Sequence, residues 1–384
     1  MDTAGIYVHI PYCRSRCLYC DFYSEGSRRA DWPRYVDALL AELRWKLREQ
    51  ASRGKEYEIA TIYIGGGTPS QMPAEEFTRL ANGLTTCAGA HLREFTIEVN
   101  PDDVTDEMAR IWRDSGVNRV SMGVQSMVDA ELRAIGRRHD PATALRAYET
   151  LGPYFDNISL DIIFGLPYQT PETLNQTIDS MLAMRPEHIS AYSLMYEERS
   201  ALTKLRDSGR MQETDEDITV GMFRTVSRRF AEAGYEQYEI SNYARPGYRS
   251  QHNSAYWAGL PYIGLGAGAH SYDGDRCRTS CVPDAKHYTR LWNDSSADVH
   301  DIGRQLYDYE LLSDTELREE MVMTRLRTRE GLYLSRYGGE FDIEELLKKA
   351  APYLKSGLLE LRDGILSLTR DGVMVSDEII ADLF

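Results

Sequence analysis

Strand-like and helix-like segments alternate through the first half of the 384-residue chain, and this alternation restricts its fold more than any other feature. The strand-like segments are short apolar runs over Gly5–Ile10, Ile59–Ile64, Phe95–Val99, Asn118–Gly123, Ile158–Phe164 and His188–Ser193. The helix-like segments repeat apolar residues at helical spacing over Trp32–Glu49, Pro73–Cys87, Thr105–Ser115, Val128–Ile135, Pro171–Met184 and Glu216–Ala233. Strands separated by helices predict an α/β fold with a buried parallel sheet. In such folds, functional groups collect at the carboxyl ends of the strands.

The alternation fades after about Arg249, where the chain takes on a different pattern. Gly264–Ala269 contains mostly small residues, and Cys277–Asp284 is predicted to be a loop. Further on, the spacing of apolar residues predicts short helices over Asp314–Arg325 and Ile343–Lys355.

Two short strands are predicted near the C-terminus, over Leu358–Leu361 and Ile365–Leu368, with a turn at Asp363 and Gly364 between them. The tail is therefore predicted to be a small helical domain with a hairpin wing, similar to a winged helix. We divide the chain into an α/β core over 1–240, a connecting segment over 241–300 and a C-terminal domain over 301–384.

The overall charge argues against some classes of partner. The formal net charge is -16, and an acidic surface repels phosphate backbones, so we expect no nucleic-acid partner. No apolar run reaches the length of a transmembrane helix, and the N-terminus lacks the pattern of a signal peptide. We therefore expect a cytoplasmic protein, with transient membrane association left open. Cysteines in that compartment more often bind metal than form disulfides.

Cys13, Cys17 and Cys20 lie close together, directly after the first predicted strand. A loop this short can point three thiolates at one centre, and cysteine thiolates are the usual ligands of iron–sulfur clusters. Three ligands leave one iron of a four-iron cluster open to a substrate or cofactor. The arginines between the thiols would stabilise an anionic cluster. The alternatives are three buried thiols, or a zinc site whose fourth ligand is His9.

A Gly-Gly-Gly-Thr-Pro sequence follows the second predicted strand, and together with the cysteine spacing it resembles the radical SAM superfamily. In that family the open iron binds the amino and carboxylate groups of S-adenosylmethionine. The resemblance implies that Tyr19 packs near the adenine and that Gly66, Gly67 and Thr68 bind the methionine amino group. It also implies a (β/α)6 partial barrel that holds a [4Fe-4S] cluster.

Further polar side chains occur near predicted strand ends or in the loops that follow, namely Glu98, Gln125, Arg137 and Asp161. Any one of them could be a helix cap or a surface ion pair. Their order matches the subfamily that contains oxygen-independent coproporphyrinogen III oxidase (HemN) and the heme chaperones (HemW). The resemblance implies that these residues contact the cofactor, with Arg137 on its carboxylate and Tyr7 beside its sulfonium.

Within the subfamily, the sequence is more similar to the heme chaperones. Phe22 stands where the dehydrogenase typically has a fourth cysteine, and the first strand begins without that enzyme's N-terminal extension. His252-Asn-Ser-Ala-Tyr256-Trp257 resembles a motif that the chaperones associate with heme. Imidazole is a standard axial ligand, and the aromatic rings offer flat faces to a porphyrin. Alternatively, His252 is a hydrogen-bonded core histidine, and His270 is a reserve ligand.

The resemblance thus implies a heme chaperone that delivers heme to acceptor hemoproteins and meets an electron donor. We expect no coproporphyrinogen III dehydrogenase activity. The alternatives are a radical enzyme that decarboxylates a tetrapyrrole or opens the heme ring, and a HemN-like methyltransferase or cyclopropanase.

Overall fold

One mixed sheet organises the larger core of the computed structural model, which describes residues 2–27 and 30–384. Its central strands run parallel, in the order β11 (Tyr262–Leu265), β1 (Asp2–Ile10), β4 (Tyr57–Gly66), β5 (Glu94–Val99), β6 (Arg119–Gln125), β7 (Ile158–Phe164) and β8 (His188–Ser193). In the described part of the chain, the sheet ends at β14 (Tyr307–Leu311) and β9 (Glu236–Gln237). The sheet is therefore open, and the predicted partial barrel is confirmed.

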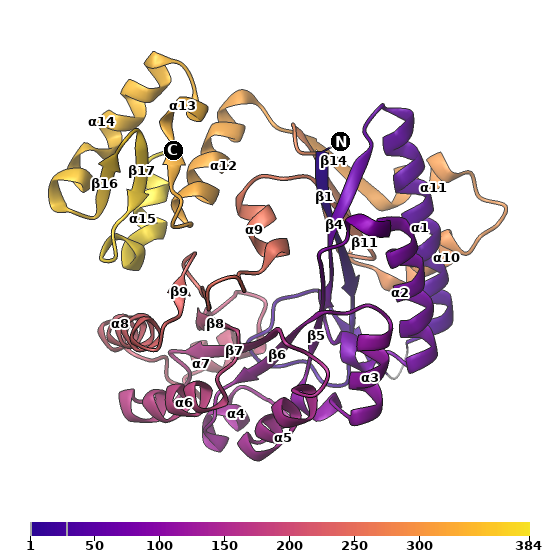
Figure 1. Ribbon diagram of the computed structural model, residues 1–384, viewed down its shortest axis with the longest axis horizontal. Helices are drawn as coiled ribbons and strands as arrows, with labels where there is room; N and C mark the ends of the chain where they lie inside the picture. Colours follow the sequence, from indigo (N-terminus) through magenta and orange to yellow (C-terminus); the bar gives the residue numbers. More distant parts are fainter. Residues whose placement is uncertain (1, 28–29) are drawn as a thin grey trace.

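Helices cover the outer side of this sheet (Figure 1). They are α1 (Trp32–Ser52), α2 (Ala74–Ala88), α3 (Asp106–Asp114), α4 (Asp129–Ala134), α5 (Pro141–Leu151), α6 (Pro171–Met184) and α8 (Glu216–Glu232). Side-chain caps begin several of them: Asp31 accepts from the backbone of Arg34, and Thr170 forms a capping box at α6. The apolar stripes then bury residues such as Leu39 and Phe77 completely. The repeating units of the sequence thus form as predicted, and α5 is an addition to them.

The segment after Arg249 contributes more to the sheet than its sequence suggests. β11 pairs in parallel with β1, and Gly264 within it is required because an added Cβ would lie 1.9 Å from the carbonyl oxygen of His270. The loop predicted over Cys277–Asp284 is wrong: β13 (Cys277–Cys281) pairs with β12 (His270–Tyr272) and with β14. Short strands of this kind are held by hydrogen bonds to their neighbours on both sides, so they carry little apolar pattern of their own.

A second core lies in the C-terminal part of the chain. It packs α12 (Asp314–Leu326), α14 (Glu340–Ser356) and α15 (Ser376–Asp382) against a small sheet of β15 (Leu332–Tyr333), β16 (Leu359–Arg362) and β17 (Ile365–Leu368). Asp363 and Gly364 have φ of 51° and 76°, as a two-residue hairpin turn requires. The predicted helices and hairpin are confirmed, and Figure 1 shows this unit (yellow) facing the sheet across α9 (Gln251–Trp257).

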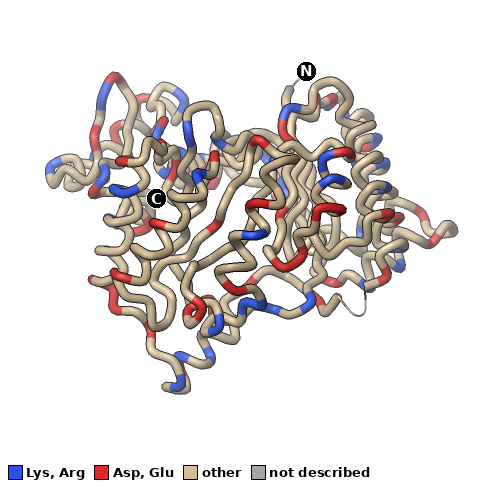
Figure 2. Tube along the Cα trace, turned by 60° about the horizontal axis from the view of Figure 1, so that its bottom comes forward, with Lys and Arg blue, Asp and Glu red and all other residues tan. Residues whose placement is uncertain are grey.

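The surface of the chain carries both signs of charge. Figure 2 shows acidic and basic residues interspersed along the outer helices, while acidic residues outnumber basic ones by 60 to 44. Across residues 2–27 and 30–384, none of the helices combines the length and the apolar character that a bilayer crossing requires.

Candidate functional site

A cavity of about 630 Å³ opens at the carboxyl ends of the parallel strands and contains the cysteine loop. It is lined by Cys13, Cys17 and Cys20 and by the predicted cofactor residues Tyr19, Gly66, Gly67, Thr68, Glu98, Gln125, Arg137 and Asp161. Segments that are distant in sequence therefore meet around one space, as expected for loops that leave one edge of a parallel sheet.

The glycine motif packs directly on the chain that leads to Cys13. The backbone N–H of Gly67 donates to the carbonyl of Ile10 at 2.7 Å, and that of Thr68 donates to Tyr12 at 2.9 Å. A Cβ at Gly67 would lie 2.8 Å from the oxygen of Ile10 and 3.0 Å from the sulfur of Cys13. Glycine is therefore needed here for close approach, and the motif orients the cysteine loop.

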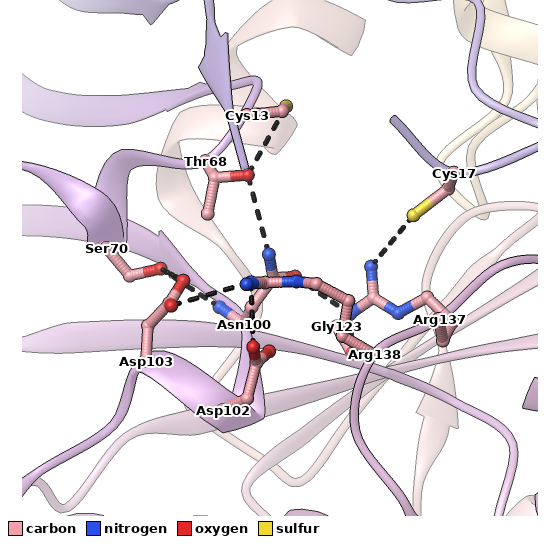
Figure 3. Close-up of polar contacts among 10 residues, drawn as sticks. All are labelled: Cys13, Cys17, Thr68, Ser70, Asn100, Asp102, Asp103, Gly123, Arg137 and Arg138. Carbon is pink, nitrogen blue, oxygen red and sulfur yellow. Dashed lines mark hydrogen bonds and ion pairs between the residues drawn. The ribbon is translucent and has the colours of Figure 1, made fainter. Parts of the chain in front are cut away.

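Two side chains donate to the cysteine sulfurs. The Thr68 hydroxyl lies 3.3 Å from the sulfur of Cys13, and Nη1 of Arg137 lies 3.5 Å from that of Cys17 (Figure 3). Nη2 of Arg137 also donates to Oδ1 of Asn100 at 2.8 Å and to the carbonyl of Gly123. The guanidinium is thus held in one orientation between β5, β6 and the cysteine loop.

The three cysteines do not form a site for a single metal ion in the described part of the chain. In the described part of the chain, no three Cys, His, Asp or Glu side chains surround one point as ligands of a single ion would. The thiolates of a four-iron cluster bind different irons and are spread around it. His9 is already engaged through both nitrogens, to Tyr7 at 3.1 Å and to the carbonyl of Tyr23 at 2.9 Å. In this arrangement it cannot complete a zinc site.

The thiols of the loop would have to lose their protons to bind iron. Burial raises the pKa of Cys13 and of Cys20, so both are thiols at neutral pH in the absence of metal. Bound iron would lower these pKa values, and the donors at Thr68 and Arg137 would stabilise the thiolates.

Two carboxyl groups also line the cavity. Glu98 accepts from the Tyr63 hydroxyl at 2.8 Å and from the backbone N–H of Gly66 at 3.1 Å, and burial raises its pKa to about 7. Asp161 accepts from Ser121 at 3.1 Å, and burial raises its pKa as well. A ligand that donates hydrogen bonds or carries positive charge would lower both values.

Tyrosines 7 and 19 take different positions. Tyr19 lines the cavity and packs against Ile135 and Ile163, a suitable edge for a flat base. Tyr7 is not among the described residues that line the cavity. Its hydroxyl bonds to His9, and its ring stacks on Tyr63 with the centroids 6.2 Å apart. Tyr7 therefore supports the wall through Tyr63, and its expected position beside a sulfonium stays a prediction.

Several lining residues escaped the sequence analysis. They include Tyr63, Asn100, Arg119, Ser121 and Ser190. Residues two apart on a strand face the same side, so Asn100 after Glu98 and Ser121 before Gly123 could have been found from strand register. Arg119 had no such signal: its side chain is 1% exposed, and its Nε and Nη1 have no hydrogen-bond partner in the described part of the chain.

The contacts of His252 are those of the alternative interpretation, a hydrogen-bonded core histidine, and heme ligation by this residue stays an untested prediction. The residue lies on α9 and is 1% exposed; Nδ1 bonds to the Thr61 hydroxyl at 2.8 Å and Nε2 to the Tyr256 hydroxyl at 3.0 Å. Burial lowers its pKa to about 3, so the ring is neutral. Neither nitrogen is free to bind iron in this arrangement. His252 anchors α9 to β4, whereas Tyr256 and Trp257 line a second, larger cavity.

A parallel partial barrel with a three-cysteine loop after its first strand defines the class as radical SAM proteins. The family model described as Radical SAM superfamily matches residues 7–181, and that of the HemN C-terminal domain matches residues 312–375. Coproporphyrinogen III oxidase (HemN) from Escherichia coli has the same fold, with a TM-score of 0.81 at 22% sequence identity over 100% of this chain and 90% of that one.

Relatives with assigned names indicate which family of radical SAM proteins the chain belongs to. The protein named heme chaperone HemW from Bacillus subtilis (strain 168) is 34% identical over 382 residues, 97% of each chain. HemW from Mycobacterium tuberculosis (strain ATCC 25618 / H37Rv) is 31% identical over 99% of this chain and 94% of its own. HemW from Escherichia coli (strain K12) is 36% identical over 70% of each chain. The chain belongs to the HemW family of radical SAM proteins.

Proposed function

We propose that the protein binds heme and delivers it to acceptor hemoproteins, while Cys13, Cys17 and Cys20 hold a [4Fe-4S] cluster and the adjoining cavity holds S-adenosylmethionine. The observation that carries the cofactor part is the convergence of the cysteine loop, Arg137 and Glu98 on one cavity of about 630 Å³. The heme part is supported by relatives named heme chaperones that match this chain over nearly its whole length.

Arg137 and Glu98 have distinct roles in the proposed cofactor site. When bound, the cluster supplies an open iron for the amino and carboxylate groups of S-adenosylmethionine. Arg137 meets the carboxylate and keeps the loop of Cys17 oriented, since its guanidinium already bonds to that sulfur. Glu98 becomes a carboxylate beside the cationic ligand and accepts hydrogen bonds from it. The fixed loop and wall position the cofactor and limit the access of water.

The test is heme titration of the anaerobically reconstituted protein, followed by transfer to a heme-free acceptor from the same organism. We expect a saturable heme spectrum and restored absorption of the acceptor. A variant with Cys13, Cys17 and Cys20 replaced by alanine should lose the iron–sulfur absorption. Cys87→Ala, a half-buried cysteine on α2, is the matched control and should keep it.

Two outcomes would contradict the proposal. One is a wild-type protein with an intact cluster that gives no saturable heme spectrum. The other is conversion of coproporphyrinogen III to protoporphyrinogen IX in the presence of S-adenosylmethionine and a reductant, which would favour the dehydrogenase instead.

A further inference from the structure

A second cavity, of about 1090 Å³, separates the α/β core from the C-terminal unit. The core side is formed by the end of β8, by α8 and by α9, and the C-terminal side by α12 and the segment around Met374. Its volume is slightly above the usual range for small-molecule sites, about 300–1000 Å³. It is therefore large enough for a macrocyclic ligand.

We propose that heme occupies this cavity and that a methionine thioether of the cavity wall, not His252, is the protein ligand of its iron. The inference rests on the proposed heme function and extends it to a specific site and donor. It follows from which donors face the cavity, from the shape of its walls and from its charges.

The side chains of the cavity wall that are best suited to bind heme iron are methionines. Within the described part of the chain, no histidine or cysteine lines the cavity, whereas Met195, Met321, Met323 and Met374 do. Thioether sulfur is an established axial ligand, as in cytochromes c. It needs no proton to be removed. By contrast, burial raises the pKa of the lining tyrosines Tyr192, Tyr256, Tyr262 and Tyr272, so a phenolate ligand is costly.

The four methionines differ in whether their sulfur is free to bind the heme iron. The sulfur of Met374 already accepts from Nε of Arg224 at 3.2 Å. Met195 follows β8 and is 66% exposed, and it lines both this cavity and the cofactor cavity. Met321 and Met323 lie on α12, across the cavity from the core. Met195 is therefore the first choice for the ligand, and the α12 methionines can approach the other face of the macrocycle.

The walls and charges suit a flat, dianionic molecule. Tyr256 and Trp257 present ring surface on α9, and the guanidinium of Arg327 lies 5.4 Å from the Trp257 ring centroid. Arg327 pairs with Asp377 at 3.5 Å.

The half-buried Arg325 has no carboxylate partner in the described part of the chain, and its Nη2 donates to the carbonyl of Ala258 at 2.7 Å. A heme propionate would supply the missing anion.

The experiment compares methionine variants of the full chain under anaerobic conditions. Wild type, Met195→Leu, Met321→Leu, Met323→Leu and the control Met108→Leu on α3 are titrated with ferrous and ferric heme, and the axial ligands are identified by magnetic circular dichroism. Leucine conserves the volume but removes the donor. We expect the wild type and Met108→Leu to show thioether ligation, and Met195→Leu or an α12 variant to lose it.

A second comparison tests the propionate contact. Arg325→Gln should weaken heme binding about tenfold or more, because a hydrogen bond between charged groups is lost. Arg329→Gln should leave the affinity unchanged, since Arg329 bonds to Glu236 and does not line the cavity.

The outcomes separate the two proposals. If the wild type binds heme but with imidazole or thiolate ligation, or if none of the three cavity methionine variants changes the spectrum, the site assignment is overturned while the chaperone function stands. If the wild type does not bind heme at all, the proposed function itself fails.

Discussion

The hydroxyl of Thr68 donates a hydrogen bond to the sulfur of Cys13, joining two positions 55 residues apart at 3.3 Å. Thr68 also accepts from Nδ2 of Asn100 at 3.4 Å, so a single side chain connects the cysteine loop, the glycine motif and the end of β5. These contacts of the cofactor wall therefore help to hold the cysteine loop in place.

Thr68→Val should weaken this connection without opening a large cavity. The variant keeps the shape of the side chain but leaves the buried sulfur and the Asn100 amide without their partner. We expect a loss of about 1–2 kcal/mol in the free energy of unfolding and faster cluster loss on dilution. Urea unfolding and the decay of the iron–sulfur absorption measure these effects. Thr85→Val, on the outer helix α2, is the control, and equal effects of both variants would contradict the prediction.

Arg137→Lys should lower the affinity for S-adenosylmethionine about tenfold or more. Lysine keeps the charge but cannot bond to the sulfur of Cys17, to Asn100 and to Gly123 at the same time. Calorimetric titration of the reconstituted protein measures the affinity, and the melting temperature shows whether the fold is kept. Arg133→Lys, on the exposed side of α4, should bind like the wild type. A folded Arg137→Lys protein with unchanged affinity would remove this residue from the cofactor site.

Much of the fold and the position of the cofactor cavity could be predicted because both follow from local patterns. Buried parallel strands are short apolar runs, and the residues that end them meet at one edge of the sheet. β13 was not predicted, because its own sequence carries little apolar pattern and the strand is defined by its hydrogen bonds to β12 and β14. The position of Tyr7 behind Tyr63 depends on side-chain packing across two strands, which the order of motifs does not contain.

Glu98 should make the apo protein less stable as the pH rises. Burial raises the pKa of Glu98 from 4.5 to about 7, so the folded state prefers the protonated acid. Its contribution is fully present below pH 4.5 and is lost as the pH passes 7. In Glu98→Gln, the amide can accept from Gly66 and donate to Tyr63, and it does not titrate.

The measurement is the difference in the free energy of unfolding between Glu98→Gln and wild type at pH 5 and pH 8. We expect this difference to shift in favour of the variant by roughly 1–3 kcal/mol. The comparison between variants is needed because burial also raises the pKa of Glu239 to about 7. Glu107→Gln, exposed on α3, should show no such shift, and a flat difference for Glu98→Gln would refute the prediction.

His252→Ala should act on stability and not on the axial ligand of heme. The wild-type ring bonds to Thr61 and Tyr256 and stacks on Tyr63 with the centroids 5.2 Å apart, so its loss leaves one buried and one partly buried hydroxyl without this partner. We expect a destabilisation of about 2–4 kcal/mol, measured by urea unfolding at pH 7. His300→Ala, on the exposed start of α11 (Val299–Leu306), should be nearly neutral.

The free energy of unfolding of wild type and of His252→Ala should depend differently on pH. Burial lowers the pKa of His252 from 6.5 to about 3, so the neutral ring stabilises the fold above pH 6.5, and this contribution is lost as the pH falls toward 3. The gap in stability between wild type and His252→Ala should therefore narrow on acidification. At saturating heme, the folded variant should keep the wild-type ligand signature. A variant as stable as the wild type that has lost one axial ligand would instead make His252 the ligand, and α9 would have to rearrange when heme binds.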